Sequence, residues 1–144
     1  STIPEPEYNW NPAVTMRNLH QVGRIGVLGI WQGRMDDKRL RVRGLYREVL
    51  KEVYRTPSPD WRQVATRCAE ILEAVPFATG CYVERGNALA RLGDVAGARK
   101  AWAGGADQLA PDDPIGLQLR ALVKASEGDR LPANWRPVRN PSLE

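Results

Sequence analysis

Small and aromatic residues between positions 82 and 111 constrain the fold of this chain more than any other feature. Two antiparallel helices approach each other closely only where the facing side chains are small, and Gly86 and Ala98 provide such positions. Leu89 and Trp102 are large enough to fill the space around the contact. The spacing therefore predicts a pair of helices packed against each other.

A turn is expected in the middle of this pair. Gly93 tolerates the left-handed conformation that ends a helix, and the carboxylate of Asp94 accepts hydrogen bonds from the free N–H groups at the start of the next helix. The same dipeptide recurs as Gly128-Asp129, 35 residues later. This recurrence predicts a structural unit that repeats along the chain.

The 35-residue step divides the chain further. It predicts a first helical hairpin over residues 43–76, a second over 78–112 and a single capping helix over 113–127. Asp113 is expected to cap this last helix, with Pro114 at its first position. The prolines that follow leave no room for another long helix.

The order of residues in the second hairpin resembles a tetratricopeptide repeat, and the residues that carry the resemblance are Tyr82, Gly86, Leu89, Gly93, Asp94, Ala98, Trp102 and Pro111. The specific match covers residues 43–127, and its best unit is 78–112. The resemblance implies an all-α, TPR-like solenoid of helical hairpins. In this family the first helices of the hairpins line a concave groove that binds peptides or partner helices.

The resemblance also implies which residues line the groove. In the best unit these positions are Val83, Asn87, Ala90 and Arg91. Asn87 coincides with an asparagine that family members use to hold the backbone or the terminal carboxylate of a ligand. Val83 replaces the lysine that normally assists it, and this replacement argues against a carboxylate clamp.

A glycine-rich segment precedes the first hairpin, with glycines from Gly23 to Gly33 around the apolar run 25–31. A phosphate-binding loop is not expected because no Gly-Lys-Ser/Thr sequence follows. We expect instead an extra N-terminal helix over residues 16–34, whose glycine stripe packs on the first hairpin or on another subunit. Trp31 is a candidate contact residue on this helix.

Two proline-rich, extended arms flank the helical domain of residues 13–127. The first covers residues 1–12 and contains Trp10, and the second covers residues 128–144 and contains Trp135. Prolines exclude regular helix in both arms. Each arm either folds over its own domain or embraces a partner chain, with its tryptophan as the main contact.

Basic residues are concentrated between Lys38 and Arg47, although the whole chain has a net charge of only +4. Arg41 and Arg43 in this strip are candidate contacts for an acidic protein surface or for phosphates. A solvated helix face with internal ion pairs explains the same charges. We do not expect a nucleic-acid partner because no recognised binding motif accompanies the strip.

Few residues are suited to catalysis. The one histidine, His20, has no cysteine or acid near it in sequence, and the two cysteines, Cys68 and Cys81, are expected to be buried small hydrophobes. The acidic pairs at 36–37 and 112–113 are expected to cap helices. We therefore expect no enzyme, no cofactor and no metal.

Taken together, these features predict a cytoplasmic, non-catalytic protein-interaction module, since no apolar run is long enough to span a membrane and no secretory signal is evident. It would act as an adaptor, an assembly factor or an accessory subunit. A structural subunit of a multi-subunit enzyme is the main alternative, and nucleic-acid binding through Arg39–Arg47 is the third. The expected partner is another protein chain, and self-association is left open.

Overall fold

The computed structural model describes residues 25–141, with side chains from Asp37 onward. The helices in this part of the chain are α2 (Ile25–Arg55), α3 (Trp61–Ala74), α4 (Thr79–Arg91), α5 (Val95–Asp107) and α6 (Pro114–Ala125). Residues 25–141 contain no strand, so the predicted all-α class is confirmed.

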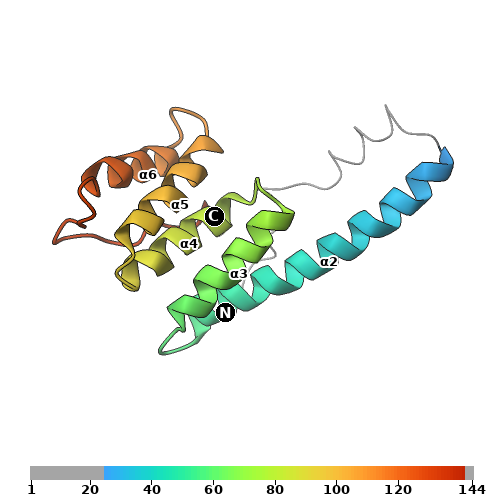
Figure 1. Ribbon diagram of the computed structural model, residues 1–144, viewed down its shortest axis with the longest axis horizontal. Helices are drawn as coiled ribbons and strands as arrows, with labels where there is room; N and C mark the ends of the chain where they lie inside the picture. The colour runs from blue at the N-terminus through green and yellow to red at the C-terminus, as the bar shows by residue number, and fades with distance from the viewer. Residues whose placement is uncertain (1–24, 142–144) are drawn as a thin grey trace.

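Each helix packs against the next one along the chain (Figure 1). The connections between successive helices are short, and short connections make neighbouring helices antiparallel. The result is a row of helices in which α2 lies at one end and α6 at the other. None of these helices, over the residues described, is both long enough and apolar enough to cross a membrane.

Helix α2 differs from the sequence prediction. We expected a separate glycine-rich helix over residues 16–34 and a new helix from about Arg43, but α2 is continuous over 31 residues. Residues 35–43 contain no proline or glycine to end a helix, and Asp37 has Arg41 one turn further on, which favours the helix. The prediction that the acidic pair 36–37 caps a helix start is therefore wrong. The first part of α2 extends well past the end of α3 (Figure 1).

Aspartates cap three of the helices. The carboxylate of Asp94 accepts from the N–H of Gly97 at 2.9 Å at the start of α5, as predicted. Asp113 accepts from the N–H groups of Ile115 and Gly116 at 2.8 and 3.2 Å, which confirms its role at the start of α6. Asp60 caps α3 in the same way.

The contact between α4 and α5 depends on a glycine. A side chain at Gly86 would collide with the indole of Trp102, which is fully buried. Ala98 is also fully buried and keeps this interface narrow. The small residues that the sequence pattern placed between these helices are thus required by close packing.

One hydrophobic core runs through the whole row of helices. Its largest fully buried apolar side chains come from four helices and are Tyr46, Leu50, Ile71, Trp102 and Leu119. Cys68 and Cys81 lie in the same core as free, fully buried thiols, as predicted.

The chain reverses direction after α6. Gly128 and Asp129 both adopt positive φ angles, of 82° and 60°, and residues 130–140 that follow contain neither helix nor strand. This part of the chain runs back past α5 toward α4 (Figure 1). We call residues 131–141 the C-terminal segment.

Candidate functional site

The C-terminal segment is held on the helices by its main chain. The side-chain amide of Asn87 on α4 donates to the carbonyl of Val138 at 2.9 Å and accepts from its N–H at 3.2 Å. The same amide oxygen accepts from the indole N–H of Trp102 on α5 at 3.3 Å. Asn87 is therefore fixed by the core and satisfies both main-chain groups of one residue of the segment.

A second recognition point lies two residues further along the segment. Asn140 is fully buried, and its amide nitrogen donates to the hydroxyl of Tyr46 and to the carboxylate of Glu84, both at 2.9 Å. The Tyr46 hydroxyl in turn lies 3.3 Å from the amide oxygen of Asn140, which accepts its hydrogen bond. This site thus recognises both ends of a side-chain amide.

Glu84 is a buried acid on α4. The Tyr54 hydroxyl donates to the same carboxylate oxygen at 2.6 Å. Burial raises the pKa of Glu84 above its ordinary value, although the hydrogen bonds from Tyr54 and Asn140 and the charge of Arg91 each lower it in part. Burial, together with the charge and the hydrogen bond of Glu84, also raises the pKa of Tyr54, a residue that is about half exposed as a whole.

Aromatic rings surround the next turn of α4. The guanidinium of Arg91 lies 4.3 Å from the ring centre of Trp61 and 5.8 Å from that of Trp135, a geometry that favours cation–π attraction. Trp135 also packs against Trp102, with ring centres 6.3 Å apart. The indole N–H of Trp135 is buried and has no hydrogen-bond partner within residues 37–141.

The segment does not fill the space against which it lies. A partly open pocket of about 480 Å³ remains beside it. Val53, Trp61 and Arg91 line this pocket on the helix side, and Pro137 and Arg139 line it on the side of the segment.

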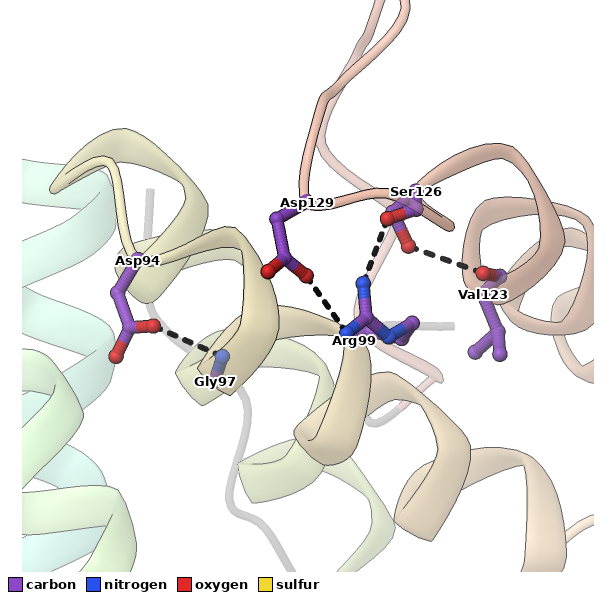
Figure 2. Close-up of polar contacts among 6 residues, drawn as sticks. All are labelled: Asp94, Gly97, Arg99, Val123, Ser126 and Asp129. Carbon is purple, nitrogen blue, oxygen red and sulfur yellow. Dashed lines mark hydrogen bonds and ion pairs between the residues drawn. The ribbon is translucent and has the colours of Figure 1, made fainter.

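Arg99 on α5 fixes the point where the chain reverses (Figure 2). Its guanidinium donates to the carbonyl of Ser126 at 2.6 Å and pairs with the carboxylate of Asp129 at 2.7 Å. The Ser126 hydroxyl donates to the carbonyl of Val123, which closes the end of α6. Because Asp129 has the unfavourable positive φ, this ion pair stabilises the turn that directs the segment back.

Six side chains define what we call the tail site, and they are Tyr46, Tyr54, Glu84, Asn87, Arg91 and Trp102. Three of them lie at positions 84, 87 and 91, so they share one face of α4. The arrangement suits the binding of an extended polypeptide, because it offers paired main-chain contacts, an amide pocket and aromatic surfaces. Within the described residues, no group of three His, Cys, Asp or Glu side chains could hold a metal ion.

The structure places the remaining predicted contact residues as follows. Trp10 lies outside the described residues, and Trp31 lies in α2 at a position whose side chain is not described. Val83 is fully buried in the core. Arg41 is exposed and lines a cavity of about 520 Å³ between α2 and α3, and Arg43 is half-buried on the same helix.

Only part of the tail site and of the segment bound to it was identified from the sequence. Asn87 and Arg91 of the site and Trp135 of the segment were candidates, whereas Glu84 of the site and Asn140 of the segment were not. A signal for Glu84 was present, because it shares a polar helix face with Asn87 and Arg91. No local pattern marks Asn140, since its partners are 94 and 56 positions away.

No protein-family model, no curated protein and no solved structure matches this chain.

Proposed function

We propose that this chain is a non-catalytic protein-interaction module with a tetratricopeptide-like arrangement of helices, which acts as an adaptor, an assembly factor or an accessory subunit. The single observation that carries this proposal is the pair of hydrogen bonds from Asn87 to both main-chain groups of Val138. A helix face that holds an extended segment by its backbone is a site for polypeptide. Under the family resemblance, Asn87 occupies the position that holds a ligand backbone.

The arrangement of helices supports the same proposal. The turn between α4 and α5 contains Gly93 with a φ of 86° and the cap Asp94, and Gly86 packs directly against Trp102. Helix α6 follows as a single helix beside α5. These features agree with one hairpin of the repeat type followed by a capping helix.

The first part of α2 supports a second contact surface. It extends past the end of α3 (Figure 1). Leu40, also on α2, has 65% of its surface exposed. An exposed leucine and a helix end that projects from the row are both features that another chain could cover. This observation favours the alternative in which the chain is a structural subunit of a larger enzyme complex.

Affinity purification of the tagged full chain tests the proposed function. We expect a partner protein to co-purify in stoichiometric amount and to form a defined complex with the purified chain in size-exclusion chromatography with light scattering. Gln118→Ala changes an exposed residue of α6 outside the tail site, so the complex should form with this control variant as it does with the wild type. Failure of any protein to co-purify with the chain under gentle conditions would contradict the proposal.

The same chromatography distinguishes an adaptor from an obligate subunit. An adaptor is stable alone, so the isolated chain should elute as a folded monomer and bind its partner reversibly. An obligate subunit should aggregate alone, because the exposed surface of α2 is then left uncovered.

A further inference from the structure

We infer that the C-terminal segment is an internal competitor, and that the tail site binds an extended segment of a partner protein in its place. The inference rests on the proposed function and deepens it by specifying the partner chemistry. The partner segment presents a tryptophan, a branched apolar residue three positions later and a side-chain amide two positions after that. These are the spacings of Trp135, Val138 and Asn140 in the occupant that the site already holds.

The pocket formed by Tyr46 and Glu84, which holds the side chain of Asn140, makes the tail site selective for a side-chain amide. Asn140 presents a donor to Glu84, and it exchanges hydrogen bonds with Tyr46 through both its nitrogen and its oxygen. A carboxylate at this position would offer no donor to Glu84 when ionised, and an apolar side chain would leave buried polar groups unpaired. The pocket therefore accepts a primary amide and rejects close analogues.

The chain's own segment is an imperfect occupant of the tail site. The buried indole N–H of Trp135 has no partner within residues 37–141, and a partly open pocket of about 480 Å³ remains beside Pro137 and Arg139. A partner segment with a large aromatic side chain at the position of Pro137 would fill the pocket against Val53 and Trp61. Better filling is the gain that allows an intermolecular segment to replace the internal one.

The internal segment has the advantage of its covalent connection. A tethered segment competes at an effective concentration on the order of millimolar, whereas a partner is present at far lower concentration. This advantage depends on the geometry of the turn that Arg99 holds through Ser126 and Asp129 (Figure 2). Arg99 does not touch residues 131–141 in any of these contacts. Substitution of Arg99 should therefore weaken the binding of the C-terminal segment without altering the tail site.

Binding of a fluorescent peptide of residues 131–141 to the full chain tests the inference, with fluorescence anisotropy as the readout. We expect weak binding to the wild type, because its own segment occupies the site. Asn140→Asp in the chain weakens the binding of its own C-terminal segment to the tail site, so it should tighten peptide binding at least tenfold. Arg99→Ala should also tighten peptide binding. A peptide that itself carries Asn140→Asp should not bind to either variant.

The peptide-binding experiment has three outcomes that bear on the inference. If folded Asn140→Asp and Arg99→Ala chains bind the peptide no more tightly than the wild type, the inference is wrong. If the Asn140→Asp chain loses its helical circular dichroism signal, the test relies on the Arg99→Ala chain, which should bind the peptide more tightly than the wild type does. If Arg99→Ala forms dimers that excess peptide does not dissociate, the occupant is the segment of a second copy, and the inference is overturned.

Failure of this inference is distinguishable from failure of the proposed function. A partner protein captured equally by the wild type and by Arg99→Ala supports the proposed function while it contradicts competition at the tail site. Peptide exchange at the tail site without any captured partner would support competition at this site and contradict the proposed function.

Discussion

The side-chain amide of Asn87 satisfies both the N–H and the carbonyl of Val138, although the two residues are 51 positions apart. A single side chain thus connects the middle of α4 to a segment without regular structure. The asparagine is itself fixed by the indole N–H of Trp102. Binding of the C-terminal segment is therefore coupled to the packing of α4 on α5.

This coupling predicts the effect of Asn87→Ala. The substitution leaves the buried indole N–H of Trp102 and both main-chain groups of Val138 without this partner, so we expect a loss of stability of about 2–4 kcal/mol. Urea denaturation followed by circular dichroism measures it. Asn134→Ala removes the same type of side chain at an exposed position of the same segment and should change the stability by less than about 0.5 kcal/mol. Equal effects of the two substitutions would contradict the role of Asn87.

Two glycines in helices are expected to respond in opposite directions to alanine. Gly86→Ala places a methyl group against the buried indole of Trp102 and should destabilise the chain by about 1–3 kcal/mol. Gly44 on α2 has no atom within 4 Å of the added methyl group, so Gly44→Ala should stabilise the helix by about 0.5–1 kcal/mol. Thermal unfolding of both variants checks the pair. A neutral or stabilising Gly86→Ala would show that α4 and α5 are not in close contact.

The raised pKa of Glu84 predicts a pH-dependent stability. Below the pKa of the unfolded carboxyl, about 4.3, Glu84 is protonated in both states. As the pH rises, the unfolded chain releases this proton first, so the wild type loses stability until the pH passes the raised pKa of the folded state. Glu84→Gln has no such proton and can still accept from Tyr54 and Asn140 through one oxygen.

The comparison of these two chains isolates the effect of one group. We expect the stability of the wild type relative to Glu84→Gln to fall between pH 4 and neutral pH, as measured by urea denaturation at a series of pH values. A difference that stays constant with pH, or that increases, would mean that the Glu84 carboxyl is not destabilised by burial.

The two thiols are expected to be unreactive in the folded chain. Cys68 and Cys81 are fully buried, and the hydrogen bond that Cys68 shares with Cys81, together with burial, raises the pKa of Cys68. A thiol reagent such as DTNB should therefore label neither cysteine at an appreciable rate until the chain unfolds. Rapid labelling of either thiol under native conditions would show that α3 and α4 separate easily.

Local patterns in the sequence predicted the helical class and the features that depend on neighbouring residues. The caps at Asp94 and Asp113 and the burial of Cys68 and Cys81 follow from residue type and spacing, and the structure confirms them. The continuous α2 was missed because glycines suggested a separate helix, whereas no residue between 35 and 43 ends one.

The tail site was only partly predictable for a different reason. Asn87 and Arg91 followed from the family resemblance, but contacts of Asn140 with Tyr46 and Glu84 join residues far apart in sequence. The sequence left open whether the arm of Trp135 covers its own domain or a partner. In the structure, Trp135 packs on Trp102 of the same chain.

Hydrogen exchange at the amide of Val138 tests most directly whether the C-terminal segment leaves its site while the helices stay folded. We predict that this amide is protected, but that it opens at a free energy at least about 2 kcal/mol below that of the α4 and α5 core amides, and that Arg99→Ala lowers it further. Exchange of Val138 only through global unfolding, with the same free energy as Trp102, would show that the segment is a permanent part of the fold and would contradict the account.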